Sequence, residues 1–182
     1  MLDRKPEPLT PKARRTRAAL VEATRQIVGE EGVPAATVQT ICARAGIGRT
    51  SYYNYFDDAP AAVAEVAETA GQEIRTAFDA LHGDRPRGLD RLETCLTMLL
   101  SIARDDPAHA LLLTALAQSD DTLPDMLSAE IAAELIGAGL SPDPAAPFMA
   151  TATLALTRRL AEGKLSADVP SCTRMLMAAC RG

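Results

Sequence analysis

The stretch from Thr37 to Phe56 contains two short helical patterns separated by a glycine, and it constrains the fold more than any other part of the chain. Thr37 is a good N-cap for a first helix that extends to Ala45, and Gly46 can take the left-handed conformation that ends a helix. A second helix is predicted from Arg49 to Phe56. Two short helices joined by such a turn form a helix-turn-helix.

The side chains of the second helix divide between two faces. Tyr52 and Phe56 lie four residues apart, so they share the inner face. The outer face carries hydrogen-bonding groups of the kind that read base edges and phosphates. The sequence therefore predicts DNA contacts from this helix and from the one before it, by Arg49, Thr50, Ser51, Tyr53, Asn54 and Tyr55, together with Thr37 and Arg44.

The net charge of −5 by itself argues against nucleic acid, but the charge is unevenly distributed. Residues 1–56 carry nine Lys and Arg against five Asp and Glu, whereas the remainder carries ten against nineteen. A basic N-terminal region on an acidic chain suits local contact with a polyanion. We therefore expect phosphate contacts from Lys12, Arg14, Arg15 and Arg17.

The whole chain reads as α-helical, because no run of alternating, β-branched residues predicts a strand. About nine helices are expected, at residues 12–31, 37–45, 49–56, 57–81, 89–104, 106–117, 123–136, 144–162 and 170–180. The fourth is predicted to be capped by Asp57 or Asp58 and to bury the stripe Val63, Val66, Ala70, Ile74, Ala77 and Leu81. A polar loop is expected from His82 to Gly88.

Several function classes are disfavoured by the sequence. The four cysteines are far apart, and neither His82 nor His109 has a partner at a catalytic or metal-ligand spacing, so we expect no enzyme, no metal and no cofactor. No apolar run is long enough to span a membrane, and the N-terminus lacks the apolar segment of a secretory signal. Reduced thiols in a cytoplasmic protein are the expected state of the cysteines.

The segment from Lys12 to about Val66 resembles the TetR family of bacterial regulators. The resemblance rests on Ala-Leu-Val-Glu-Ala in the first helix, the stop at Gly32, Thr37-Val-x-x-Ile, Ala43-x-Ala-Gly-Ile-Gly and the final Tyr-Tyr-x-Tyr-Phe. Gly48 departs from the pattern, because a Ser or Thr usually caps the recognition helix there. The resemblance implies an all-helical fold with a three-helix DNA-binding domain, here residues 1–56, and a larger ligand-binding and dimerisation domain, here 57–182.

The resemblance further implies a repressor that binds palindromic operator DNA as a homodimer and is released by a small-molecule effector. A helical protein-interaction module without DNA binding is the alternative. Few aromatic residues and few buried charges are expected in the second domain, which favours a hydrophobic or weakly polar effector. The candidate pocket residues are Phe78, Met98, Ile102, His109, Leu112 and Leu116, although all six could equally be ordinary core.

The stretch from 145 to 157 has no charged residue and is apolar or small on every side. Such a helix is either an interface with a second copy of the chain or the centre of the chain's own core. We expect the interface, with a four-helix bundle formed by this helix and the last one. The predicted interface residues are Phe148, Ala152, Ala155, Leu156, Met175, Leu176 and Ala179.

Overall fold

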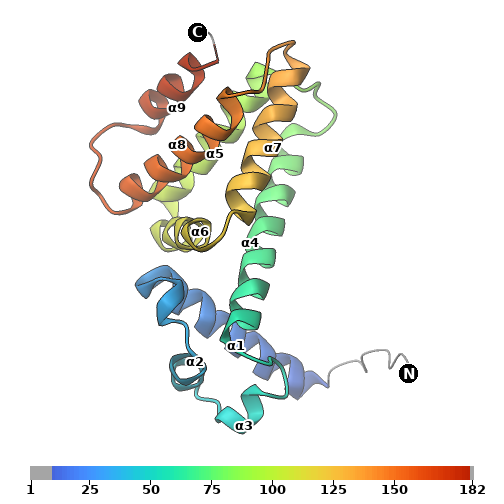
Figure 1. Ribbon diagram of the computed structural model, residues 1–182, viewed down its shortest axis with the longest axis vertical. Helices are drawn as coiled ribbons and strands as arrows, with labels where there is room; N and C mark the ends of the chain where they lie inside the picture. Colours follow the sequence, from blue (N-terminus) through green and yellow to red (C-terminus); the bar gives the residue numbers. More distant parts are fainter. Residues whose placement is uncertain (1–9, 181–182) are drawn as a thin grey trace. The chain divides into compact units, whose positions relative to one another are not determined.

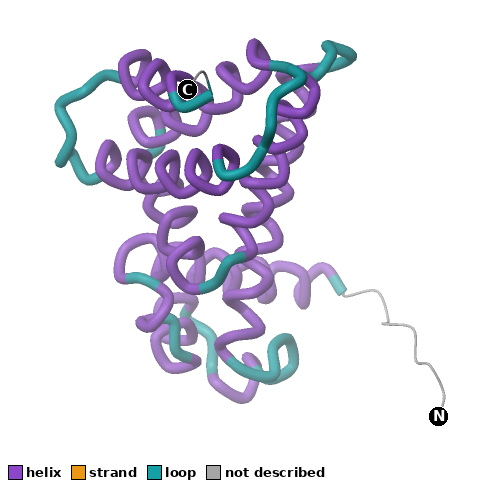
Figure 2. Tube along the Cα trace, turned by 45° about the horizontal axis from the view of Figure 1, so that its top comes forward, coloured by secondary structure: helices purple, strands orange, loops and turns teal. Residues whose placement is uncertain are grey.

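The computed structural model describes residues 10–180, in which it places nine α-helices and no strand (Figures 1 and 2). The predicted all-α class is confirmed. Arg4 and Lys5, which contribute to the basic N-terminal region of the sequence, lie outside the described residues. Within residues 10–180, none of the helices combines the length and apolarity needed to cross a membrane.

The described residues form two compact units that divide between Val66 and Ala67. The first, residues 10–66, is called the head, and the second, residues 67–180, the body. The head contains α1 (Pro11–Glu31), the 3₁₀ turn η1 (Val33–Ala35), α2 (Val38–Ala45), α3 (Arg49–Tyr52) and the start of α4 (Ala59–His82). The body contains the rest of α4 with α5 (Leu89–Asp105), α6 (Pro107–Ser119), α7 (Thr122–Gly137), α8 (Ala145–Ala161) and α9 (Val169–Ala178).

The head has a small apolar core, and its first helix begins at a well-formed cap. Thr10 caps α1 by accepting a hydrogen bond from the Ala13 amide at 3.2 Å, and Pro11 occupies the first helical position, where its missing amide hydrogen costs nothing. α1 packs against η1 and α2. The side chains buried there are Leu20, Ala23, Ile27, Val28, Ile41, Tyr52, Phe56, Ala62 and Val66.

The buried stripe of α4 differs from the predicted one at both ends. Ala62 is buried where Val63 was expected, and Val63 and Ala77 are half-buried. Ala70 and Ile74 are buried as expected, but the stripe continues through Phe78 and His82, while Leu81 is 43% exposed. A step of four residues overshoots a helical turn by about 40°, whereas a step of three undershoots it by about 60°. The prediction for Leu81 was therefore wrong, because the stripe keeps stepping by four and rotates away from it.

His82 is also not the loop residue that the sequence predicted. It ends α4 and is only 3% exposed. Its Nδ1 lies 2.6 Å from the Phe78 carbonyl oxygen, and its Nε2 lies 3.2 Å from the Arg91 carbonyl oxygen. The imidazole thus joins the end of α4 to α5, which a solvated loop histidine would not do.

α8 lies at the centre of the body and packs against α5, α6, α7 and α9 (Figure 1). One face of it is buried, through Met149, Ala150, Thr153 and Thr157. The hydroxyl of Thr153 donates to the Met149 carbonyl at 2.6 Å, which satisfies a polar group that would otherwise be buried without a partner.

Candidate nucleic-acid interface

α2 begins at a reciprocal cap. The Thr37 hydroxyl accepts from the Thr40 amide at 3.2 Å, and the Thr40 hydroxyl accepts from the Thr37 amide at 2.9 Å. A capping box of this kind normally uses Glu or Gln at the third helical position, and here a threonine does the same. The hydroxyl of Thr37, a predicted DNA contact, is therefore already used as the N-cap of α2.

The turn between α2 and α3 depends on the backbone freedom of Gly46. Its φ of 67° and ψ of 30° are left-handed, and the Ile47 amide donates to the Cys42 carbonyl at 3.1 Å. No atom lies within 4 Å of where a Cβ would be, so it is the backbone conformation and not space that favours glycine. The predicted end of the first helix at Ala45 is confirmed.

α3 is shorter than predicted. Regular helix covers only Arg49–Tyr52, and after it the amides of Asn54 and Tyr55 donate to carbonyls three residues back, at 3.3 and 2.9 Å. The Phe56 amide still donates to Tyr52, four residues back. The predicted helix to Phe56 was therefore too long, because the last turn tightens into bonds of the 3₁₀ type before the chain turns toward α4.

Two aromatic rings anchor α3 in the head. Tyr52 is fully buried, and its hydroxyl donates to the Asp58 carbonyl oxygen at 2.8 Å. Its ring lies 5.6 Å from that of Phe56, which is also buried. Burial raises the pKa of the Tyr52 hydroxyl to about 12. These contacts fix the orientation of α3 and therefore decide which of its side chains face outward.

The outer face of α3 carries the predicted base-reading groups. Arg49, Thr50, Ser51 and Asn54 are exposed, and Tyr53 is 57% exposed, while Tyr55 is half-buried. Arg49 donates to the Gln39 side-chain oxygen of α2 at 3.1 Å. This contact holds the guanidinium at the start of α3, and Gln39 was not predicted because neither residue type nor spacing distinguishes it in the sequence.

The predicted phosphate-binding residues fall into two groups. Lys12, Arg14 and Arg15 are exposed at the start of α1, and none of them forms an ion pair with another residue between 10 and 180. Arg17 instead pairs through both terminal nitrogens with the carboxylate of Glu65 on α4. Its guanidinium also lies 5.4 Å from the centre of the Phe56 ring.

Arg44, the remaining predicted contact, joins α2 to the end of α1. It lies 2.8 Å from a Glu30 carboxylate oxygen and 3.1 Å from one of Glu31. The hydrogen bond to Glu30 is the main reason that the pKa of Arg44 is raised.

The sequence predicted that Asp57 or Asp58 caps α4. The structure shows that the cap is Asp58, whose carboxylate accepts from the Ala61 amide at 2.8 Å.

The predicted ligand-binding residues are spread over the body. Phe78 lines a cavity between α4, α5 and α7. Leu112 and Leu116 are buried, whereas Met98, Ile102 and His109 are half-buried, and none of these five lines that cavity. The assignment of a pocket to them stays a prediction.

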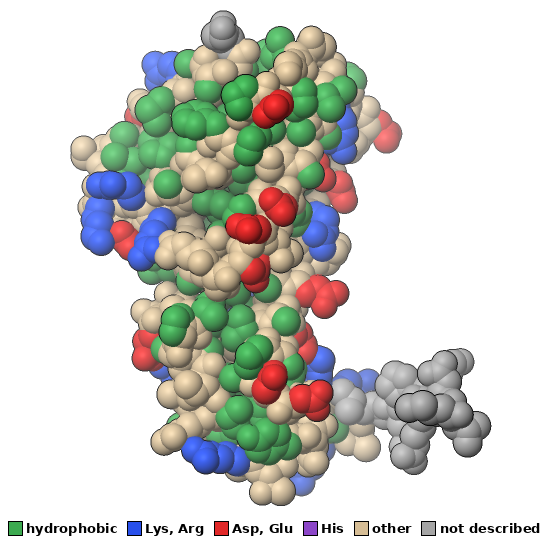
Figure 3. Space-filling model, in the orientation of Figure 1, with side chains coloured by type: hydrophobic (Ala, Val, Ile, Leu, Met, Phe, Trp, Pro, Cys, Tyr) green, Lys and Arg blue, Asp and Glu red, His purple; other side chains and the backbone are tan. Residues whose placement is uncertain are grey.

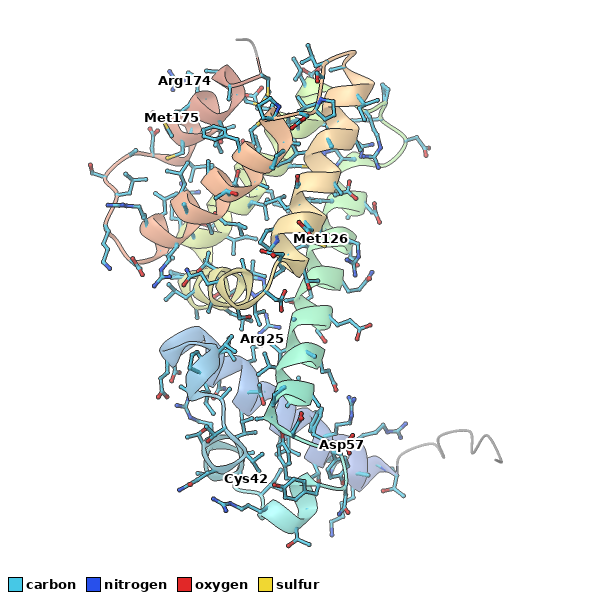
Figure 4. All side chains as sticks on the ribbon, in the orientation of Figure 1. Arg25, Cys42, Asp57, Met126, Arg174 and Met175 are labelled. Carbon is cyan, nitrogen blue, oxygen red and sulfur yellow. The ribbon has the colours of Figure 1, made fainter. Side chains whose placement is uncertain are left out.

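The predicted dimer residues lie on α8 and α9, where Arg174 and Met175 project from α9 (Figure 4). Phe148 is 62% and Met175 58% exposed. Ala155 and Ala179 are exposed as well, and Ala152 and Leu156 are half-buried. Leu176 is only 2% exposed and packs within its own body, so its side chain is unavailable to a partner in this conformation.

Residues 20–58 match the family of bacterial regulatory proteins named the tetR family. This match spans α1 from Leu20, the turn at Gly46, and α3 with its aromatic anchors. A search of the curated proteins finds no match to the sequence.

Solved structures share the fold over almost the whole chain. The fatty acid degradation regulator FadR from Bacillus halodurans is 14% identical with a TM-score of 0.72, and the match covers 97% of each chain. A TetR-like transcriptional regulator from Rhodococcus sp. RHA1 is 18% identical with a TM-score of 0.65, covering 95% of this chain and 96% of that one. The protein of a SmeT–triclosan complex is 18% identical with a TM-score of 0.71, covering 91% of each.

At such identities these structures establish the fold alone, and the family match is confined to the head. Its helix-turn-helix has the matched sequence, the left-handed glycine and the aromatic anchors in one domain. Residues 20–58 of the chain therefore carry the helix-turn-helix of the tetR family of bacterial regulatory proteins.

Proposed function

We propose that the protein is a repressor that binds palindromic operator DNA as a homodimer and is released by a small-molecule effector. The observation that carries this proposal is the outer face of α3, where Thr50, Ser51 and Asn54 are exposed on a segment anchored by Tyr52 and Phe56. A rigidly held row of hydroxyl and amide groups suits readout of base edges in the major groove.

Sequence-independent affinity would come from Lys12, Arg14 and Arg15. These side chains are exposed and have no ion-pair partner among residues 10–180, so each can approach a phosphate without first breaking an internal bond. Tyr53 and Tyr55 add hydroxyl groups suited to phosphate oxygens. In this proposal Arg17 and Arg44 serve instead to hold α1 against α4 and α2, through their carboxylate partners.

A dimer is proposed because one short recognition helix reads too few base pairs to find a site in a genome. Two-fold symmetric copies would read half-sites about 34–36 Å apart, or a multiple of that distance. The proposal is supported by hydrophobic side chains that gather over the face bearing α8 and α9 (Figure 3). Phe148 and Ala155 of α8 and Met175 of α9 are exposed.

An effector is proposed on the strength of the fold. One structural neighbour was solved in complex with triclosan, and another is described as a γ-butyrolactone receptor, 17% identical with a TM-score of 0.61. Both names associate a protein of this fold with the binding of a small molecule. We extend that property to this chain as part of the proposal.

Selection of bound sequences from a random duplex library tests the DNA-binding part. We expect the full-length protein to enrich a palindromic motif. Replacing Asn54 by Ala should change the enriched bases. The Arg14→Ala variant should enrich the same motif with weaker affinity, because phosphate contacts carry no direct sequence information. Recovery of unenriched sequences by the folded wild-type protein would contradict the proposal.

Sedimentation tests the dimer. The Ala155→Glu variant places a charge on the exposed, uncharged face of α8, and we expect it to sediment as a folded monomer with weakened operator binding. Ala80→Glu is the matched control, because Ala80 is an exposed helical alanine on α4. A wild-type monomer at micromolar concentration, or an Ala155→Glu dimer, would refute this interface.

A further inference from the structure

A cavity of about 140 Å³ lies in the body between α4, α5 and α7. Its apolar wall comes from all three helices and consists of Phe78, Leu92, Leu96, Leu127 and Ile131. All of these side chains are at most 6% exposed. An apolar protein cavity of about 150 Å³ accommodates benzene. The cavity here has a comparable volume, with an apolar wall on one side and charged residues in the rest of its lining. The space therefore fits an apolar group of about the size of one six-membered ring.

Part of the cavity lining is an ion-pair network built around the buried carboxylate of Glu134. Glu134 is 2% exposed, and its Oε1 lies 3.4 Å from Arg87 Nη1 and 3.2 Å from Arg91 Nε. Its Oε2 accepts from the Gly88 amide at 2.9 Å. Arg87 Nη1 also lies 3.3 Å from Glu130. The two carboxylates and the two guanidinium groups thus neutralise one another. Glu134 is the one carboxylate or cation that is buried among residues 10–180, which agrees with the few buried charges expected from the sequence.

The ion pair between Arg91 Nε and Glu134 lacks the geometry of a hydrogen bond. The Nε atom is buried and stands within ion-pair distance of Glu134, yet its N–H makes no hydrogen bond. The neighbouring Nη1 donates to the Arg85 carbonyl oxygen at 2.8 Å. These contacts hold the Arg91 side chain in the cavity wall, so it is not free to bind a ligand.

Arg75 is an exposed cation of the cavity lining, and among residues 10–180 it has no carboxylate partner. It projects from α4 toward Met126 of α7, the residue labelled in Figure 4. Its Nε and Nη2 donate to the Gln72 side-chain oxygen at 3.3 and 3.1 Å, and its Nη1 lies 3.0 Å from the Met126 sulfur. Amide and thioether acceptors are neutral, so solvent and not a carboxylate of the described residues compensates the guanidinium charge.

We propose that this cavity binds a small organic monocarboxylate, with its apolar body in the Phe78 and Ile131 lining and its carboxylate on Arg75. The planar fork of a guanidinium matches a carboxylate in bidentate geometry. This inference rests on the proposed function, because such a ligand would be the effector. It also replaces the hydrophobic or weakly polar effector expected from sequence with a singly charged, amphipathic one.

The charges around the cavity favour an anion over a cation. Glu130 and Glu134 already have arginine partners, so a ligand ammonium group would have to displace those partners to reach either one. Asp79, the remaining acid of the lining, is exposed as Arg75 is, and it lies one helical turn from Arg75 on α4, so an ammonium group there would also meet the arginine. A carboxylate on Arg75 needs only to replace the weak contacts to Gln72 and Met126.

Isothermal titration of the full-length, DNA-free protein tests the proposal with four probes of matched chemistry. Benzoate should bind with a dissociation constant below about 1 mM, given its number of atoms. Benzyl alcohol and benzylammonium have a ring of the same size without the carboxylate and should bind at least about tenfold more weakly. 2-Naphthoate, whose rings exceed the cavity, should bind more weakly than benzoate as well.

Variants locate the site. Arg75→Gln should weaken benzoate binding at least about tenfold, while Arg159→Gln, a change at an exposed arginine on α8, should leave it unaltered. Absence of benzoate binding, equal binding of benzylammonium, or full binding by Arg75→Gln would overturn the proposal. Because no DNA is present, these results are independent of operator binding. A protein that binds its operator but not benzoate would refute the ligand class and leave the proposed regulator intact.

Discussion

Arg14 and Arg17 lie on the same turn of α1, but the structure predicts opposite consequences when each is replaced by alanine. Arg14 is exposed and has no ion-pair partner among residues 10–180, whereas both terminal nitrogens of Arg17 are held by Glu65. A side chain whose charge is already compensated releases few counterions when DNA binds. We therefore expect Arg14 to contribute to the salt dependence of DNA binding and Arg17 to the stability of the head.

The expected magnitudes separate the two variants clearly. Each phosphate contact contributes about 0.9 to the slope of log affinity against log salt, so Arg14→Ala should flatten the slope by about that amount. Between about 50 and 200 mM salt, the loss of one contact changes the affinity ratio about 3.5-fold. Arg17→Ala should leave the slope within about 0.3 of the wild type, because no phosphate contact is lost.

For the stability of the head, Arg17→Ala should have the larger effect and Arg14→Ala the smaller one. The side chains of Arg17 and Glu65 are 40% and 21% exposed, so the pair is only partly screened by solvent. Together with the contact to the Phe56 ring, its loss should cost about 1–2 kcal/mol. Arg14→Ala should cost less than about 0.5 kcal/mol, as for an ordinary surface substitution.

Fluorescence anisotropy at graded salt concentrations and urea unfolding measure the two effects. A double-mutant cycle with Glu65→Ala should return a coupling energy of about 1 kcal/mol for the pair. If Arg17→Ala flattens the salt slope as much as Arg14→Ala does, the guanidinium leaves Glu65 for a phosphate in the complex, and this reasoning is refuted.

Three further changes have expected outcomes in thermal or chemical unfolding. Gly46→Ala forces a left-handed alanine and should destabilise the head by about 1 kcal/mol, whereas Gly48→Ala, at φ −68°, should be nearly neutral. Because the pKa of Tyr52 is raised to about 12, the folded head retains a proton that the unfolded chain loses above pH 10. Stability should therefore fall as pH rises from about 10 to about 12, and Tyr52→Phe should lessen that fall. Glu134→Gln should cost about 3 kcal/mol because it leaves Arg91, whose side chain is only 16% exposed, without its carboxylate partner. Glu130→Gln, at a side chain 38% exposed, should cost less than about 1 kcal/mol.

The local features of the head could be predicted from the sequence because their causes lie within a few residues. Thr37 and Gly46 bound α2 through a cap and a left-handed turn, both of which depend on residue type and spacing alone. Tyr52 and Phe56 were expected on one face from their separation of four residues, and both are buried. The early end of α3 could not be predicted. The same residues can form hydrogen bonds either four residues back, as in an α-helix, or three residues back, as the amides of Asn54 and Tyr55 do.

Contacts between distant segments could not be predicted in the same way. Arg17 and Glu65 are 48 residues apart, and no local pattern distinguishes this arginine from Arg14. The end of α4 was also difficult to predict. A shift of one position in the buried stripe decides whether Leu81 or His82 is buried, and the structure buries His82. The cavity in the body depends on three helices that meet only in the folded chain, so its lining has no signature in sequence spacing.

A base-substitution scan of the selected operator tests most directly whether the outer face of α3 reads base edges. Each base pair would be replaced in turn, and the affinity of the wild type, Asn54→Ala and Arg14→Ala measured for every duplex. We expect Arg14→Ala to weaken all duplexes by the same factor. Asn54→Ala should lose the wild-type penalty, typically about 1–3 kcal/mol, at one or two positions in each half-site and keep it elsewhere. An Asn54→Ala profile that parallels the wild type at every position would contradict base readout by this face.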